Sequence, residues 1–145
     1  MEELVKLLDE NLKYLSHEIQ DERIYIYVQS NRDEATCPYC GQTSIWVHSL
    51  YPRKYQDLPI QGKKVTIIIR NRKFFCKDPG CSHKTFAESF DFLKPKATKT
   101  NRLQEEITRV SLNQSSVSAA EYLKGSTCDV GKSTICNLLK KKMGQ

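Results

Sequence analysis

Four of the six cysteines in the chain come in two pairs whose spacing suits metal binding. One pair is Cys37-Pro38-Tyr39-Cys40, followed by Gly41, and the other is Cys76-Lys77-Asp78-Pro79-Gly80-Cys81. Each pair brackets a turn, and Gly41 permits a backbone in which N–H groups point back at the sulfurs. Two such turns can place four thiolates tetrahedrally around zinc, in a closed site that supports folding and leaves no catalytic position. The sequence therefore predicts one structural Zn²⁺ per chain, bound by Cys37, Cys40, Cys76 and Cys81.

Spacing alone leaves other interpretations of these residues open. His83 follows Cys81 by two residues and could replace it as a ligand. The cysteines could also be ordinary buried thiols, or the first pair could be a redox pair, although no strand–helix unit follows Cys40. Cys128 and Cys136 have no Cys or His at ligand spacing, so we interpret both as ordinary thiols.

The cellular compartment also bears on the cysteines. The first residues, MEELVKLLDENL, are acidic and amphipathic and lack the basic start and apolar core of a secretory signal. We therefore expect a cytoplasmic protein, in which thiols stay reduced and paired cysteines favour metal over disulfides. No run of roughly 18 apolar residues occurs, which argues against a membrane-spanning segment.

Charge is distributed unevenly along the 145 residues, of which 39% are hydrophobic and 28% charged. The net charge of +6 combines −5 over residues 1–36, +9 over 37–102 and +2 over 103–145. Any polyanion should therefore meet the middle and the tail of the chain. The alternative interpretation is that these lysines and arginines only keep the exposed surface of strands hydrated and bind no partner. The modest apolar content favours two small modules over one large core.

Hydrophobic periodicity predicts the following elements. Leucines at helical spacing predict a helix over residues 2–15. Alternating or β-branched segments predict strands at 23–29, 44–49, 51–58 and 65–70, with turns at 59–62 and a tight turn or bulge at 71–72. Three further helices are predicted at 102–112, 116–124 and 132–142, the second starting at a cap on Ser116 or Ser118 and stopping at Gly125.

These elements predict an α+β fold in two domains. Residues 1–92 form a small β-rich, zinc-ribbon-like domain with an N-terminal helix, 93–101 are a basic linker, and 102–145 are an all-helical helix-turn-helix domain. The last two helices carry apolar residues suited to packing: Ala119, Ala120, Leu123, Ile135, Leu138 and Leu139. Their connection is longer than the usual three or four residues. A small helical hairpin with a solvated face is the alternative.

The residues left outside the apolar stripe suit DNA. A helix entering the major groove needs short polar residues and Asn for base edges, with lysines at its flanks for phosphates. Candidate groove residues are Lys132, Ser133, Thr134 and Asn137, flanked by Lys140 and Lys141. Candidate phosphate contacts in the linker are Lys94, Lys96, Lys99 and Arg102. Arg70, Arg72 and Lys73 could extend this footprint from the ribbon.

The segment from Gly125 to Ser133 superficially resembles a phosphate-binding loop. Five residues separate Gly125 from Gly131 where that loop has four, and a helix precedes it where a buried strand is required. We therefore expect no nucleotide as a partner.

The chain resembles the N-terminal part of a bacterial insertion-sequence transposase of the ISL-three family. The resemblance rests on CPYCG at residues 37–41, on YQDLPIQGKKVTIIIRNRKFFC at 55–76, on CKDPGCSHKTFAESF at 76–90 and on the helices that follow. It includes the family motif D-L-P at Asp57-Leu58-Pro59 and covers about residues 20–142.

The resemblance implies a four-Cys zinc domain followed by a helix-turn-helix that binds transposon terminal inverted repeats as double-stranded DNA. The family's carboxylate catalytic domain has no counterpart in this chain, so we expect DNA recognition without enzymatic activity. Implied partners are DNA on the bacterial nucleoid and a second copy or a full-length transposase. Alternatives are a stand-alone repressor of transposition, or a protein-interaction module with Trp46, Tyr51 and Tyr55 as its contact face.

Overall fold

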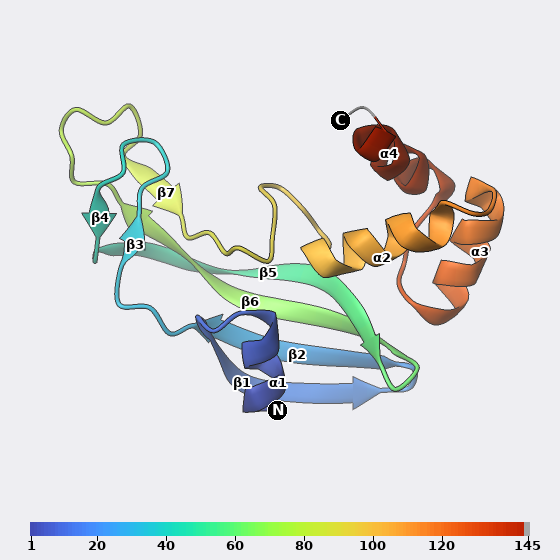
Figure 1. Cartoon of the computed structure of the whole chain (residues 1–145). Coiled ribbons are helices and arrows are strands. Elements are labelled where there is room, and N and C mark those ends of the chain that lie inside the picture. The colour runs from blue at the N-terminus through green and yellow to red at the C-terminus, as the bar shows by residue number, and fades with distance from the viewer. Residues whose placement is uncertain (144–145) are drawn as a thin grey trace.

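The computed structural model describes residues 1–143 and consists of a twisted β-sheet, a small zinc-ribbon-like end and a group of helices (Figure 1). The helices and strands follow in the order α1 (Glu2–Leu8), β1 (Leu12–Gln20), β2 (Arg23–Ser30), β3 (Ala35–Thr36), β4 (Thr43–Ser44), β5 (Val47–Ile60), β6 (Lys63–Phe75), β7 (Thr85–Ala87), α2 (Asn101–Ser111), α3 (Ser116–Ser126) and α4 (Lys132–Met143).

The main sheet has the strand order β1-β2-β6-β5, with β7 paired to the end of β6. Strand β2 is antiparallel to β1 and parallel to β6, and β5 is antiparallel to β6. The β5–β6 hairpin reverses at Gln61 and Gly62, whose φ angles of 49° and 79° are both left-handed. Such a turn matches the twist of the flanking strands and is readily adopted by Gly.

One face of this sheet is buried in the main hydrophobic core. Alternate residues of β2 and β6 point into it, namely Ile24, Ile26, Val28, Val65, Ile67 and Ile69. Helix α1 covers this face through Val5, and Phe90 and Phe92 pack beside it from the chain that leaves β7. The period of two along each strand therefore sets which face is buried.

The predicted N-terminal helix over 2–15 is wrong in its second half. Helix α1 ends at Leu8, and the chain turns where the Asp9 carboxylate accepts the N–H of Asn11 at 2.7 Å. Leu12 then enters the core and begins β1. Antiparallel pairing with β2 satisfies the backbone of this segment and overrides the helical spacing of its leucines.

The β hairpin is also longer than the sequence pattern predicted. Residues 47–60 form one strand of 14 residues where two strands were expected, and β6 runs for 13 residues without the predicted tight turn or bulge at 71–72. Asn71 is buried and donates a hydrogen bond to the Tyr51 hydroxyl at 2.9 Å. Continuous pairing between β5 and β6 carries the sheet to the zinc end.

Helices α2, α3 and α4 pack around a second core of buried residues: Leu103, Ile107, Ala119, Ala120, Leu123, Cys128, Val130 and Ile135. Thr100 caps α2, and Ser115 caps α3 in place of the predicted Ser116 or Ser118. Helix α3 continues through Gly125 to Ser126, so this glycine does not stop it. Within residues 1–143, no helix is both long and apolar enough to cross a membrane.

The segment between the sheet and the helices is attached to β5. The N–H of Gln56 donates to the Thr98 carbonyl, and the Gln56 carbonyl accepts the N–H of Thr100, both at 2.9 Å. The buried Asp57 carboxylate accepts the Thr100 hydroxyl at 2.7 Å and two hydrogen bonds from Arg102 at 2.9 and 2.5 Å. These contacts orient the start of α2 relative to the sheet.

A second connection joins the α3–α4 loop to the sheet. Asp129 accepts two hydrogen bonds from Arg23, at 2.9 and 3.0 Å, and one from Lys64 at 3.1 Å. The Gln56 amide also exchanges hydrogen bonds with the backbone of Asp129. The helices are therefore docked on the sheet at two separate points.

Candidate metal centre and nucleic-acid interface

The first cysteine pair lies in a tight turn between β3 and β4. The N–H of Gly41 donates to the Cys37 carbonyl at 2.9 Å, and the N–H of Cys37 donates to the Gln42 carbonyl at 2.8 Å. Gly41 has a φ of +81°, a conformation that residues with a Cβ rarely adopt. This turn presents the thiols of Cys37 and Cys40 on the same side, as the spacing predicted.

The second pair lies between β6 and β7. The Asp78 side chain accepts the N–H of Gly80 at 3.0 Å, and the Asp78 carbonyl accepts the N–H of Cys81 at 3.1 Å. The N–H of Cys76 donates to the Lys84 carbonyl at 2.8 Å, which closes the loop at its base. The Pro-Gly turn predicted from the sequence thus holds Cys76 and Cys81 near each other.

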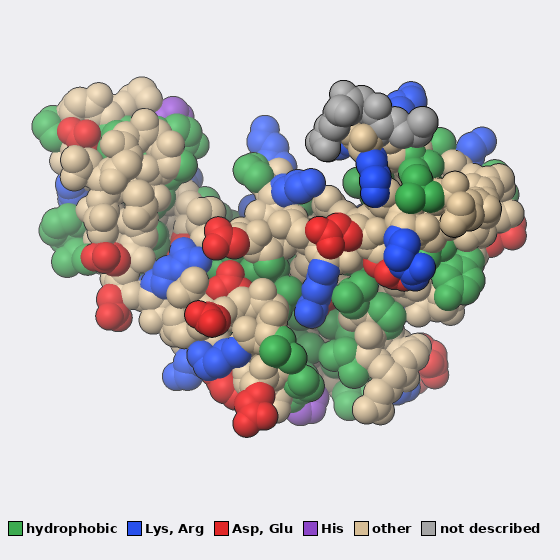
Figure 2. All heavy atoms as spheres, viewed as in Figure 1, with side chains coloured by type: hydrophobic (Ala, Val, Ile, Leu, Met, Phe, Trp, Pro, Cys, Tyr) green, Lys and Arg blue, Asp and Glu red, His purple; other side chains and the backbone are tan. Residues whose placement is uncertain are grey.

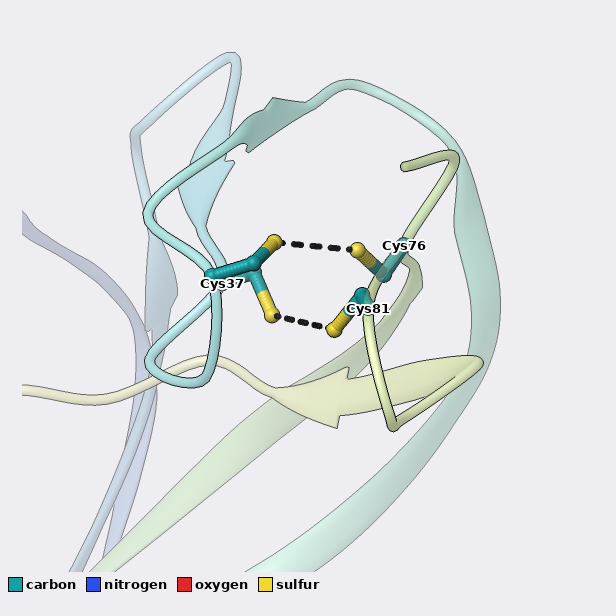
Figure 3. Close-up of side chains that lie close together, drawn as sticks. Cys37, Cys76 and Cys81 are labelled. Carbon is teal, nitrogen blue, oxygen red and sulfur yellow. Dashed lines mark hydrogen bonds between the residues drawn. The ribbon is translucent and has the colours of Figure 1, made fainter. Parts of the chain in front are cut away.

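The four thiols meet between the two turns, as Figure 3 shows for Cys37, Cys76 and Cys81. All four sulfurs lie within 4.8 Å of one another. The distance between sulfurs is 3.9 Å for Cys37 and Cys81 and 3.5 Å for Cys40 and Cys76. Zn–S bonds of about 2.3 Å in a tetrahedron place sulfurs about 3.8 Å apart, so the donor set fits zinc.

The thiols influence one another's ionisation. Burial by itself raises the pKa of Cys37, but N–H groups of Tyr39 and Cys40 and the neighbouring thiols lower it to about 7. For Cys40, the N–H of Gln42 lowers the pKa, whereas burial and the other three thiols raise it to about 12. Four adjacent thiolates repel one another, and a bound divalent cation removes this penalty.

His83 is not part of the ligand set, which resolves the alternative left open by spacing. The four-residue cluster contains Cys81, and the N–H of His83 donates to the Cys81 sulfur at 3.4 Å. The His83 ring stacks on Tyr39, with ring centroids 3.5 Å apart. His83 therefore supports the second turn and joins it to the first.

Little apolar packing supports the zinc end. Its core consists of Ala35, Cys37, Phe74 and Phe86, with Cys40, Cys76 and Cys81 packed against it. The rings of Phe74 and Phe86 stack at 5.8 Å beneath the thiols. Such a small core depends on the metal, because zinc binding contributes directly to the free energy of folding.

Two paired cysteine turns joined by β-strands define a zinc ribbon, and this one binds a single structural Zn²⁺ through Cys37, Cys40, Cys76 and Cys81. Residues 33–84 match the protein family described as the zinc-finger of transposase IS204/IS1001/IS1096/IS1165. No curated protein and no solved structure matches the chain.

Most of the predicted DNA-contacting residues are exposed in and around α4. Figure 2 shows Lys and Arg side chains over the helical end and beside the hollow that separates it from the zinc end. The exposed candidates are Lys94, Lys96, Lys132, Ser133, Asn137, Lys140 and Lys141, whereas Lys99 and Thr134 are half-buried. Lys94 and Lys141 border a groove of about 340 Å³ between α2 and α4.

Two of the expected basic contacts have other partners. Arg102 lies in the first turn of α2, in keeping with the helix predicted from residue 102, but its guanidinium binds Asp57 while the side chain stays 41% exposed. Arg72 is half-buried and donates to Glu88 at 2.9 and 3.0 Å, and the Glu88 side chain is fully buried. Both arginines therefore hold parts of the fold together, whereas Arg70 is exposed.

Three residues that shape this region were not predicted from the sequence. Lys142 was not among the predicted DNA contacts, but it is exposed and lines the groove between α2 and α4. The role of Asp57 and Asp129 in holding the helices on the sheet could not be predicted from local sequence, because their partners lie 43 to 106 residues away in the chain. The exposure of Lys142 could have been inferred from the run Lys140–Lys142, since three consecutive lysines cannot all face an apolar core.

Proposed function

We propose that the chain binds double-stranded DNA at transposon ends, as the recognition part of a transposase, with α3 and α4 acting as a helix-turn-helix. The observation that carries the proposal is the group of exposed lysines around α4. Lys94, Lys96, Lys132, Lys140, Lys141 and Lys142 form no ion pair with any residue in the range 1–143. Exposed cations without an ion-pair partner in that range are available for phosphates.

The exposed face of α4 has the side chains that base recognition needs. Ser133, Asn137 and Lys140 are spaced so that they follow one line along the helix, opposite the buried Ile135. An Asn amide in the major groove can pair with an adenine edge, and a short Ser allows close approach. The α3–α4 connection of five residues is held against the sheet by Asp129, which gives α4 a defined orientation.

The family match supports this proposal independently of the helices. The matched family is the zinc-finger of transposases, which are enzymes that act on DNA, and the match covers the ribbon but not α2–α4. A stand-alone repressor of transposition would use the same DNA chemistry. Both roles require this surface to bind the same duplex.

The phosphate contacts can be tested by salt dependence. We expect Lys140→Gln with Lys141→Gln to weaken binding to every duplex and to reduce the slope of log affinity against log salt by about 1.8, at about 0.9 per contact. Fluorescence anisotropy with labelled duplexes at four salt concentrations measures both effects. Lys6→Gln is the matched control, because Lys6 lies on α1 in the acidic N-terminal region. Equal slopes for all three proteins would refute the proposed interface.

Base reading by Asn137 needs a preferred duplex, which can be selected from a random duplex pool. On that duplex, Asn137→Ala should cost about 1–3 kcal/mol, and on scrambled duplex much less. Asn113→Ala is the control, since Asn113 is exposed in the α2–α3 connection. Equal losses on both duplexes would show that Asn137 does not read bases, and absence of duplex binding at low salt would refute the function itself.

An apolar surface on the ribbon favours a second function, which is protein binding. Trp46 is 49% exposed, and Ile45, Val47 and Phe75 nearby are also exposed. Lys77 lies over the rings of Trp46 and Phe75, 5.5 and 5.0 Å from their centroids. Tyr55 was predicted to belong to this face, but it is buried in the main core. Binding through this surface would be insensitive to salt.

A further inference from the structure

The main sheet has a second face, opposite the one that α1 covers (Figure 1). Because successive residues of a strand point to opposite faces, the neighbours of the buried core residues lie there. On β2 these are Tyr25 and Tyr27, and on β6 they are Thr66, Ile68 and Arg70. Both tyrosines are half-buried, which leaves part of each ring open to solvent.

Strand register places basic side chains near Tyr27. One row crosses the sheet from Tyr27 to its partner Ile68 and then to Lys54 on β5. The next row places Lys13 on β1 and Arg70 on β6, on either side of β2. All three basic side chains are exposed, and none forms an ion pair with a described residue.

The surface between these rows is hollowed. A depression of about 660 Å³ is lined by Leu15, Tyr27, Leu50, Pro52, Ile68 and Arg70. Its lining is aromatic and aliphatic apart from Ser16 and the basic Arg70, and strand register places Lys13 and Lys54 at neighbouring positions of the same face. This combination suits a ligand that presents flat apolar groups together with negative charges.

We propose that this open sheet face binds single-stranded DNA, with bases stacked on Tyr25 and Tyr27 and phosphates bound by Lys13, Lys54 and Arg70. Aromatic side chains at alternate positions of a central strand can each stack one base, because every base has a flat apolar face. Basic side chains nearby then hold the backbone without reading sequence. The choice of DNA over RNA rests on the proposed function of the helices.

Two other occupants fit this face less well. Two copies of the chain packed face to face would bring two surfaces together that each carry Lys13, Lys54 and Arg70, and the acidic residue Glu18, which pairs with Tyr25, offsets only part of this charge. Like charges opposite one another disfavour such a dimer. An intact duplex presents phosphates and groove edges, so its stacked bases offer no free face to the tyrosines.

The test uses the zinc-loaded chain and a fluorescein-labelled oligo(dT) of 12 nucleotides, with anisotropy as the readout. Replacing both Tyr25 and Tyr27 by Ile keeps residues suited to a strand but removes the stacking surface. We expect the Kd for oligo(dT) to rise at least tenfold, while the Kd for duplex stays within twofold. The matched control is Tyr122→Ile, an exposed tyrosine on α3, which should leave oligo(dT) binding within twofold.

A second variant removes one basic charge from this face and leaves both tyrosine rings in place. Arg70→Gln should weaken oligo(dT) binding and reduce the slope of log affinity against log salt by about 0.7, the value for one phosphate contact on a single strand. Lys6→Gln, with the same change of charge, should leave that slope as it is. Zinc content of one per chain together with an unchanged circular dichroism spectrum shows that each variant is folded.

The outcomes separate this proposal from the duplex-binding function. Loss of oligo(dT) binding in the tyrosine variant with duplex binding retained supports the sheet face as a distinct site. Equal oligo(dT) affinity in the tyrosine variant and the unmutated chain would overturn it, whatever the duplex result. It would also be overturned by tighter binding of oligo(U) than oligo(dT), or by sedimentation showing a dimer that the tyrosine variant dissociates.

Discussion

The zinc end and the helical end of this molecule reach stability in different ways. The zinc end has a core of four buried residues and holds its two turns together through four thiols. The helical end buries eight residues between three helices and contains no metal-ligand cluster among residues 101–143. A small module can replace missing apolar burial with a metal, whereas three packed helices bury enough surface to manage without one.

This difference has a consequence for how the two ends respond to damage. Removing the metal should affect the zinc end first, and removing apolar volume should affect the helices first. The connections at Asp57 and Asp129 decide how far each disturbance spreads to the other end. Four changes test this contrast, beginning with the largest expected effect.

Cys37→Ser should unfold the zinc end, because the metal site and the local fold form together. Structural zinc contributes about 10–16 kcal/mol of apparent binding free energy in small zinc fingers, which is more than this core can replace. Amide hydrogen exchange would show lost protection over residues 35–44 and 74–87, with protection retained in α2–α4. Cys136→Ser, outside the cluster, is the control. A folded ribbon without zinc would contradict the prediction.

Ile135→Ala should produce the opposite pattern. Ile135 is fully buried among the three helices, so truncation leaves a cavity and costs about 2–5 kcal/mol. Thermal unfolding followed by circular dichroism at 222 nm should show the loss, while zinc content stays at one per chain. Val117→Ala, at an exposed position of α3, should change stability very little. If zinc were lost together with the helices, the two ends would form one cooperative unit.

Asp57→Asn should loosen the connection between sheet and helices. The change removes the charge that binds Arg102 and weakens the acceptor for the Thr100 hydroxyl, at a cost of about 1–3 kcal/mol. Hydrogen exchange at the amide of Thr100 should accelerate, with the amides of β2 and β6 unaffected. Glu105→Gln on the exposed side of α2 serves as the control. Unchanged exchange at Thr100 would show that the backbone pairing with Gln56 is sufficient.

Asp129 should make the smallest contribution, and it should depend on pH. Hydrogen bonds from Arg23, assisted by Lys64, lower the pKa of Asp129 from 3.8 to about 2. The stabilisation is therefore fully present above pH 3.8 and is lost as the pH falls through about 2. Because Asp129 is 54% exposed, we expect only about 0.2–1 kcal/mol.

The measurement for Asp129 is a comparison with Asp129→Asn. Both proteins lose zinc in acid as the thiolates are protonated, so the difference in free energy of unfolding between them isolates this carboxylate. That difference should shrink between pH 4 and pH 2. A difference that stays constant across this range would mean that Asp129 is not charged in its docked position.

Local sequence was sufficient to predict the zinc site. The ligand set is confirmed, because two cysteines in one turn are brought together by a few residues of backbone and need little help from the rest of the chain. The strand at 23–29 and the three C-terminal helices were also predicted within a few residues, since alternation and helical spacing are local patterns.

Tertiary structure decided what local patterns leave undetermined. Residues 12–15 have the spacing of a helix but form a strand, because pairing with β2 and burial of Leu12 outweigh local propensity. Arg72 and Arg102 were predicted from the sequence to be cations available for DNA, but each binds a buried carboxylate distant in the chain. A side chain's charge is a property of its residue type, but its partner is set by which distant segments the fold brings within about 3 Å.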